Sequence, residues 1–530
     1  MSPMSPEKLN ELNERKKKRE KKCEEEKDRE KELYSKECVA HCINFVVGEA
    51  RDEVADLKIH DKFSCYLATI LARDKEVIAV WLNILKDNSE IYLSKNFDWL
   101  NEDVKYIDDI TKYLEVISKN TPMKSADTEK AFIGDVMTYC NTKFENRWDK
   151  LKNDIENGDN EHVKSLKDYI SANLGDSETS FYISRVCYDY YKQIKAKVNS
   201  NISPKFLGHI KKVGSYYGSI KGIIACATNI QYKPLFSNIK VNRGRPVIID
   251  EQPIYSWENI IKRFIGEDED KYNCFMARCS KKPKVMERIR KVYTDNATKQ
   301  LQLNNDNAEK CIYLHAEMNI LALIIDNNIK NRVFIAVSKR CCFLCELYIN
   351  FAIEQGYNIV IYGKHEKLYD RWILPHVKNS DFKYKSLMYI LENLDQIIKK
   401  KIERYTRSLP ADSDSGGNSP DSYDDENKQC MTDLDFGTTW TAWILKDFGL
   451  GYKGKLGRET PFLDLDLGLG YKDKLERGAS SWTCFSVLDY ERECQPEPRF
   501  WLRLYIKIRD AWILAWGCFP RPGFWLVFEL

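Results

Sequence analysis

The chain contains 530 residues with a formal net charge of +3, and 43% of its residues are hydrophobic and 31% charged. This length suggests two to four domains, and the apolar fraction is enough for a core in a rather polar, soluble protein. The nearly balanced charge excludes a general basic field, so any nucleic-acid-binding surface has to be local.

The seventeen cysteines are odd in number and irregularly spaced, and residues 1–36 are charged rather than apolar, unlike a signal peptide. We therefore expect reduced thiols in an intracellular compartment, nucleus or cytoplasm, with selected cysteines binding metal. The window closest to a membrane span, residues 511–530, is interrupted by PRPG, so no contact with a membrane is expected.

The N-terminal segment, residues 1–36, predicts a charged and exposed helix. From residue 7 onward it mixes both charge signs and carries little apolar surface, which is typical of an isolated helix with i,i+4 ion pairs. The run RKKKREKK (15–22) also resembles a nuclear-import or nucleic-acid patch. Its interleaved glutamates favour the solvated helix.

Residues 37–229 predict a mainly helical N-terminal region. Residues 63–87 place apolar side chains at helical spacing without an internal Gly or Pro, and residues 131–155 and 176–198 follow a similar pattern. This region also offers surfaces to protein partners, so a helical scaffold over residues 1–200 is one candidate role.

Residues 230–400 predict an α/β domain. The stretch up to residue 300 alternates short apolar runs with Gly, Asn and Pro, and basic residues gather toward its end. Such a run is usually a solvated face, but next to a catalytic cleft it would steer phosphates. The basic residues are Arg278, Lys281, Lys282, Lys284, Arg288, Arg290 and Lys291.

The following residues predict strand–helix–strand–helix–strand with short connections, which indicates an α/β sheet with helices packed on it. Both helices are strongly apolar, and the second is closed by Gly356 as a C-cap. The predicted strands are 311–314, 331–337 and 357–363, and the predicted helices begin at His315 and cover 341–356.

Three potential metal ligands stand at the starts of these two helices. His315 opens the first helix, Cys342 opens the second, and Cys345 lies one turn further on the same face. In such a unit the two helix starts emerge on one side of the sheet, so the three side chains can converge. Thiolate and imidazole are the ligands that zinc prefers, and three of them leave a fourth position for water.

Glu317 follows His315 by two residues and is free to point at a zinc-bound water. A carboxylate there can take a proton from water and pass it to a leaving amine, which is the chemistry of hydrolytic deamination. The alternatives are a structural His with unrelated core cysteines, or a thioredoxin-like redox CxxC. The redox alternative explains neither His315 nor Glu317.

The segments HAEMNILALI, IAVSKRCCFLCELYI and YNIVIYGKHEKLYDRWILP resemble the nucleic-acid and nucleotide deaminase superfamily, and more narrowly its OTT_1508-like deaminases. The resemblance covers residues 230–385 and is strong over 311–375. It implies a deaminase-like α/β/α sandwich, a mixed sheet with zinc-bearing helices. It also implies that His315, Cys342 and Cys345 bind zinc and that Glu317 shuttles protons. Proline often precedes the CxxC in the superfamily, whereas Cys341 here adds a third thiol.

Three residues after these elements are weaker candidates for contact with a substrate. His365 follows a predicted strand and could contact a substrate or a phosphate, although a loop histidine is more often a structural hydrogen-bonding group. Tyr369 and Trp372 could stack on a base, with packing as the default interpretation.

The C-terminal part of the sequence changes character. Residues 408–429 are rich in Ser, Asp, Gly and Pro, and we predict a disordered linker over 401–429. Residues 430–530 form a Trp- and Gly-rich tail of unknown fold, in which GLGYKGKL (449–456) and GLGYKDKL (468–475) are too few copies for a solenoid.

Together these patterns favour a zinc-dependent hydrolase that deaminates cytosine or adenine in nucleic acid or a nucleotide. The alternative is a catalytically inactive, zinc-containing module that binds nucleic acid or protein. An intact Glu317 argues against that alternative, because a structural zinc does not need the carboxylate.

Overall fold

The computed structural model describes residues 6–406 except for 51–56, 86–87, 120–121, 175–178, 197–201, 230, 233–234, 237, 296–297 and 307. These residues belong to one compact unit, Met1–Phe436. Most of the predicted linker and the whole predicted tail, residues 430–530, lie outside the described residues.

The fold is organised around a five-stranded mixed sheet with the strand order β3-β2-β1-β6-β7. Strand β1 is antiparallel to both of its neighbours, whereas β2 and β3 are parallel, as are β6 and β7. The strands are β1 (Ile78–Ile84), β2 (Ser89–Lys95), β3 (Ile239–Arg243), β6 (Val333–Val337) and β7 (Ile359–Ile361).

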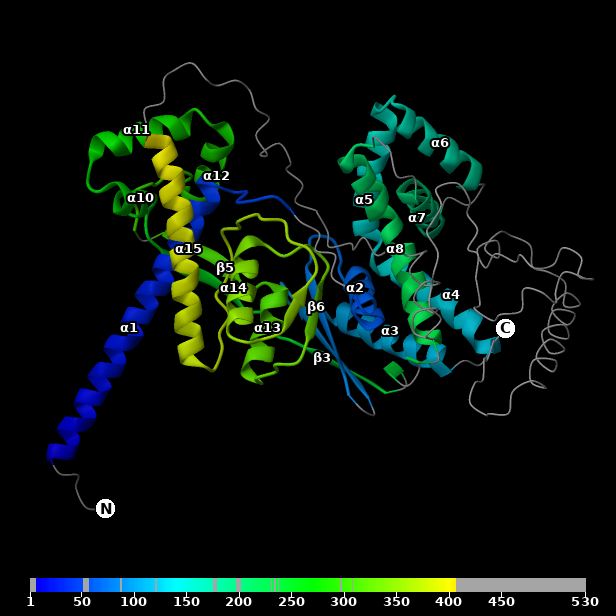
Figure 1. The fold of residues 1–530 in the computed structure, drawn as a ribbon, viewed down its shortest axis with the longest axis horizontal. Coiled ribbons are helices and arrows are strands. Elements are labelled where there is room, and N and C mark those ends of the chain that lie inside the picture. The colour runs from blue at the N-terminus through cyan, green and yellow to red at the C-terminus, as the bar shows by residue number, and fades with distance from the viewer. Residues whose placement is uncertain are drawn as a thin grey trace, which may run out of the picture. The chain divides into compact units, whose positions relative to one another are not determined.

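Both faces of this sheet are buried under helices. Along β6, Val333, Ile335 and Val337 enter one hydrophobic core, whereas Phe334 and Ala336 enter a second core. Successive side chains of a strand point to opposite faces, so an entirely apolar strand is stable only between two layers. The first core contains α13 (Ala316–Asp326) and α14 (Phe343–Glu354), and the second contains α2 (Ile59–Ile70), on the other side of the sheet (Figure 1). This α/β/α arrangement confirms the predicted fold class.

The elements around the predicted metal ligands largely follow the predictions. The second predicted strand and the second helix appear as β6 and α14, and Gly356 has a φ of 83° beyond the helix end. Strand β5 (Ala308–Tyr313) is the exception, because it pairs with β4 (Ile248–Ile254) in a separate two-stranded sheet. Its Glu309 and Cys311 are exposed, so β5 lacks the two apolar faces that a central strand needs.

The N-terminal region is mainly helical, as predicted, but it also supplies β1 and β2 to the sheet. The helix predicted over residues 63–87 is wrong in its second half, because α2 ends at Ile70 and a turn precedes β1. The run IAVWL (78–82) is apolar without a break, so periodicity cannot separate a strand from a buried helix, and pairing with β2 and β6 decides. The helices that follow are α3 (Asn101–Lys119), α4 (Pro122–Tyr139), α5 (Asn141–Asn157), α6 (Glu161–Leu174), α7 (Ser180–Ala196) and α8 (Pro204–Thr228).

The first helix is longer and more buried than the sequence predicted. Helix α1 (Pro6–Ile43) packs along α15 (Ser380–Thr406), as Figure 1 shows. Leu33 and Tyr34 are buried, so the expectation of an exposed helix over residues 1–36 is wrong at its end. Lys36 is buried there too, and its ammonium group pairs with Glu32 at 2.7 Å. Three short helices complete this part: α10 (Trp257–Ile265), α11 (Glu269–Ser280) and α12 (Pro283–Tyr293).

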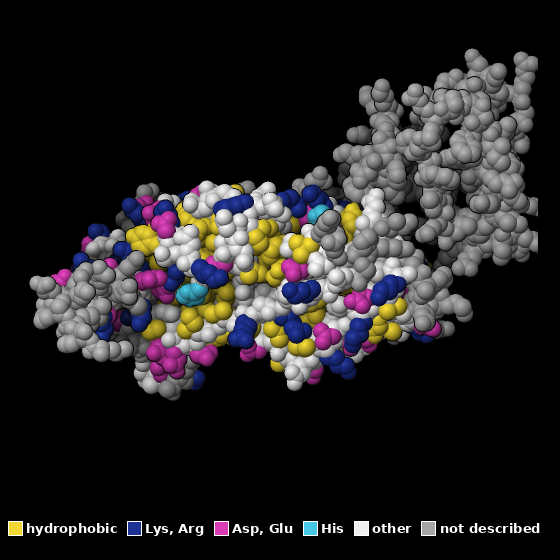
Figure 2. Space-filling view, turned by 90° about the horizontal axis from the view of Figure 1, so that it is seen from below, with side chains coloured by type: hydrophobic (Ala, Val, Ile, Leu, Met, Phe, Trp, Pro, Cys, Tyr) yellow, Lys and Arg dark blue, Asp and Glu magenta, His cyan; other side chains and the backbone are white. Residues whose placement is uncertain are grey.

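The surface of the described residues mixes charges of both signs. Figure 2 shows Lys and Arg side chains interspersed with Asp and Glu side chains over one face. This distribution agrees with a net charge of only +3. None of the described helices is both long enough and apolar enough to cross a membrane.

Candidate metal centre

His315 and Cys342 occupy equivalent positions at two helix starts. Each is the N-cap residue of its helix, His315 of α13 and Cys342 of α14, and each has an extended backbone. Cys345 lies in the first turn of α14 and is fully buried. The predicted convergence of the three side chains is therefore present.

The geometry of these three side chains suits a tetrahedral metal ion. Their ligand atoms all lie within 4.8 Å of one another. The Nδ1 atom of His315 is 3.5 Å from Sγ of Cys342 and 3.3 Å from Sγ of Cys345. Tetrahedral zinc with Zn–N near 2.0 Å and Zn–S near 2.3 Å requires an N–S separation of about 3.5 Å. The group can therefore hold zinc with little rearrangement.

The electrostatics of the group favour an ionised thiol at Cys342. Burial alone would raise the pKa of this thiol, but a hydrogen bond with Cys345 and the charge of His315 outweigh it and hold the pKa well below its usual range. Burial lowers and the negative charge of Cys342 raises the pKa of His315, and the net direction is upward. Burial and the neighbouring thiols raise the pKa of Cys345.

Cys341 is not a member of the convergent group. Its thiol donates a hydrogen bond to the carbonyl oxygen of Cys342 at 3.2 Å, and burial raises its pKa to about 12. The sequence predicted Cys342 and Cys345 as the ligands despite the third thiol, and the convergent group contains this CxxC pair.

Glu317 is the carboxyl group nearest this centre in the sequence, and it lies in the first turn of α13. It is 3% exposed, and burial raises its pKa, while the charge of His315 and a hydrogen bond with Cys345 act in the opposite direction. A buried carboxyl whose pKa is shifted by burial and by neighbouring charges is a candidate proton-transfer group.

A cavity of about 630 Å³ opens onto the centre. His315, Glu317 and Cys342 line it together with aromatic and amide side chains and with five cations. The aromatic and amide residues are Phe97, Tyr313, Tyr369, Asn96 and Asn146, and the cations are Lys75, Lys150, Lys339, Arg340 and Arg371.

Residues 314–376 match the OTT_1508-like deaminase family. The matched segment contains His315, Glu317, Cys342 and Cys345, so the predicted resemblance is confirmed where it was strongest. No curated protein and no solved structure matches the chain. A deaminase family match and a His-Cys-Cys group that can hold a metal ion therefore fall in the same part of this protein.

The three weaker candidates within residues 314–376 differ in their position relative to the cavity. His365 is buried and lines the cavity, where its Nδ1 accepts a hydrogen bond from the Lys367 backbone N–H at 3.1 Å. Burial lowers its pKa to about 4. Tyr369 also lines the cavity, with its ring centroid 5.5 Å from that of His365. Trp372 is fully buried against Tyr348, which confirms the default interpretation of packing.

The basic run over residues 277–293 does not reach the cavity beside the candidate metal centre. Its seven cations lie on or between α11 and α12, and none of them lines the cavity. Arg288 instead donates from Nε to the carbonyl oxygen of Cys42 at 3.0 Å. The hypothesis that this run flanks the catalytic cleft is therefore wrong. The cations that do line the cavity come from separated segments, and no motif in the sequence indicated Lys75 or Lys150.

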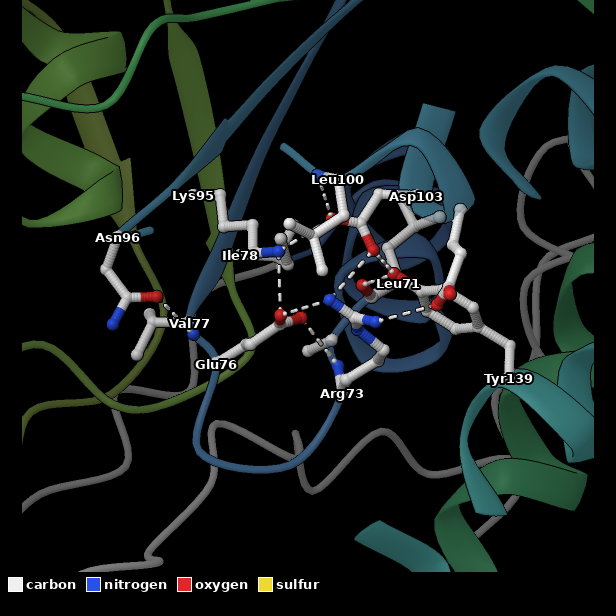
Figure 3. A network of polar contacts seen from close by, with 12 residues as sticks. Leu71, Arg73, Glu76, Val77, Ile78, Lys95, Asn96, Leu100, Asp103 and Tyr139 are labelled. Atoms are coloured by element: carbon white, nitrogen blue, oxygen red, sulfur yellow. Dashed lines mark hydrogen bonds and ion pairs between the residues drawn. The ribbon is translucent and has the colours of Figure 1, made fainter. Parts of the chain in front are cut away.

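One wall of the cavity is held by a buried ionic network (Figure 3). The Lys95 ammonium group contacts Glu76 at 2.7 Å and Asp103 at 2.8 Å, and Arg73 contacts the same two carboxylates at 3.1 and 3.2 Å. Two cations and two carboxylates compensate one another's desolvation, as a buried ion pair requires. The network fixes the turn between α2 and β1, which carries Lys75.

Proposed function

We propose that this protein is a zinc-dependent hydrolytic deaminase that acts on a nucleobase, cytosine or adenine, in nucleic acid or a nucleotide. The observation that carries the proposal lies within the segment that matches a deaminase family: His315, Cys342 and Cys345 converge, and Glu317 lines the same cavity as His315 and Cys342. His315, Cys342 and Cys345 are the proposed zinc ligands. A zinc ion held there supplies Lewis acidity and lowers the pKa of water.

Side chains around the proposed zinc site transfer the proton and bind the base. Glu317 takes a proton from the attacking water and delivers it to the departing amino group, so the amino-bearing carbon gains oxygen and ammonia leaves. Tyr313 and Tyr369 offer ring faces to a planar base, and His365 offers a ring nitrogen. Glu317 is 3% exposed although it lines the cavity, so few routes lead from its carboxyl group to bulk water.

The test compares the full-length, zinc-loaded protein with its Glu317→Gln variant. Both are incubated with cytidine, adenosine, their nucleotides and single-stranded oligonucleotides, and ammonia and product mass are measured. We expect the variant to keep its zinc and to lose ammonia release by at least about 100-fold, the usual contribution of a general acid–base group. Glu354→Gln, at the exposed end of α14, is the matched control and keeps the parent rate.

The outcome also decides between the enzyme and its alternative. A Glu317→Gln variant as active as the parent on its best substrate would show that the proposed mechanism is wrong. A parent protein that binds zinc and nucleic acid but releases no ammonia from any of these substrates would favour the inactive binding module.

A further inference from the structure

Three exposed cations from three separate segments line the cavity beside the candidate metal centre. Lys75 lies in the turn between α2 and β1, Lys150 lies on α5, and Arg371 follows β7. All three are exposed, whereas His315, Glu317 and Cys342 are half-buried or buried. The cations therefore belong to the outer part of the cavity and the candidate metal centre to its inner part.

These three side chains differ from the neighbouring Lys152 because their charged groups make no hydrogen bond or ion pair with the described residues. Among the residues that the structure describes, no hydrogen bond or ion pair engages the ammonium groups of Lys75 and Lys150 or the guanidinium group of Arg371. By contrast, Lys152, two residues further along α5, pairs with Asp149 at 3.3 Å. The five cations that line the cavity repel one another, and only two carboxylates, Asp74 and Glu317, line it with them. The outer cavity is thus suited to an anion.

Helix α5 is anchored where it meets the cavity. Lys143, in its first turn, is 6% exposed and donates from its ammonium group to the carbonyl oxygen of Ala72 at 3.3 Å. Just before the helix, the Cys140 thiol donates to the carbonyl oxygen of Ile70 at 3.1 Å. These contacts tie α5 to the end of α2, next to the turn that carries Lys75. Because these contacts hold the start of α5 beside the turn, Lys150 and Lys75 line the same cavity.

We propose that Lys75, Lys150 and Arg371 bind phosphate groups of the substrate, so that α5 of the N-terminal helical region forms part of the substrate site. The identity of the substrate rests on the proposed function, whereas phosphate binding itself needs no turnover. Phosphate oxygens accept hydrogen bonds from Lys and Arg, and such contacts release counterions, which makes the affinity depend on salt. Inward of the cations, the base reaches Glu317 and the candidate metal centre.

The experiment measures binding in the zinc-loaded, full-length Glu317→Gln background, where turnover is expected to be at least about 100-fold slower. The probes are a fluorescent single-stranded oligonucleotide without terminal phosphate and a nucleoside monophosphate, each titrated at several salt concentrations. Lys150→Gln is compared with Lys152→Gln, which removes a charge from the same helix outside the cavity. We expect Lys150→Gln alone to weaken binding several-fold and to reduce the log–log salt slope for the oligonucleotide by about 0.7, the value for one phosphate contact on a single strand.

Each result has a defined meaning. Weaker binding of the oligonucleotide assigns Lys150 to a phosphodiester, and weaker binding of the monophosphate assigns it to a terminal phosphate; both support the inference. The inference is overturned if Lys150→Gln binds both probes like the parent, if Lys152→Gln loses as much affinity, or if the parent binds neither probe. Phosphate binding that depends on Lys150 without any ammonia release from the wild type would remove the proposed function alone.

Discussion

Cys342 carries two tasks at the start of α14. Its sulfur accepts a hydrogen bond from the backbone N–H of Cys345 at 3.4 Å, which satisfies one of the unpaired donors of the first turn. The same sulfur faces Nδ1 of His315. A negatively charged thiolate is favoured at a helix N-terminus, so the capping role and the proposed ligand role support each other.

Replacement of Cys342 by serine separates these two tasks. Serine is a good N-cap, so the start of α14 is retained. Its hydroxyl stays protonated at neutral pH and is a poor zinc ligand. We expect the zinc content, measured by elemental analysis of the full-length protein, to fall from about one ion per chain to near zero. The unfolding temperature should fall as well, because metal binding is linked to folding.

Cys341→Ser is the control for this change. The two positions are adjacent and both buried, but Cys341 stands outside the convergent group. The control should keep its zinc. If Cys342→Ser binds zinc as tightly as the parent, the assignment of this ligand is wrong.

At the residue scale, the sequence predicted the site residues whose positions are set by the helix that carries them. His315, Glu317, Cys342 and Cys345 occupy two helix starts, and helix geometry fixes where such residues point. Lys150 carried no such signal, because its place at the cavity depends on contacts that hold the start of α5 at the end of α2.

At the scale of elements, close helix packing explains a glycine in α8. A Cβ atom added to Gly214 would lie 2.6 Å from the backbone nitrogen of Tyr188 in α7. Backbone atoms cannot move aside as a flexible side chain can, so α7 and α8 pack this closely only because Gly214 has no side chain.

Gly214→Ala should therefore destabilise the protein by about 1–3 kcal/mol, as overpacking usually does. Gly208→Ala, in the same helix, provides the matched control, because a Cβ atom there meets nothing within 4 Å. Alanine is favoured over glycine in a helix by about 1 kcal/mol, so the control should be neutral or stabilising. Urea unfolding of both variants checks the opposite signs. Equal midpoints for the two would show that the α7–α8 contact does not limit stability.

Helices and strands were predicted correctly where the sequence pattern fitted only one type of secondary structure. Strand β6 is short, apolar and β-branched, and α14 is bounded by Cys342 and Gly356, so both were placed correctly. Strand β1 was assigned to a helix, because its continuous apolar run suits a buried helix equally well. Its partner β6 lies about 250 residues away in the sequence, and no local pattern predicts such a pairing.

At the scale of the whole molecule, the sheet draws its strands from both sides of the predicted domain boundary at residues 229 and 230. Strands β1 and β2 precede that boundary, and β3, β6 and β7 follow it. Strand β1 is the middle strand of the sheet and contributes to both hydrophobic cores through Ile78, Ala79, Val80 and Trp81. Helix α13, which carries Glu317, therefore packs on strands that lie far upstream in the sequence.

This organisation predicts that residues 230–436 cannot fold without the preceding chain. Removal of β1 would leave the buried edge of β6 unpaired and expose apolar surface on both faces of the sheet. We expect residues 1–436 to give a monodisperse protein with a cooperative thermal transition and about one zinc ion per chain. Residues 230–436, which keep His315, Glu317, Cys342 and Cys345, should aggregate or remain unfolded and should retain no zinc after gel filtration. Circular dichroism and elemental analysis of the two proteins make the comparison. A shorter protein that folds cooperatively and holds zinc would show that the motif segment is autonomous, and the upstream strands would then be an addition to the fold rather than its centre.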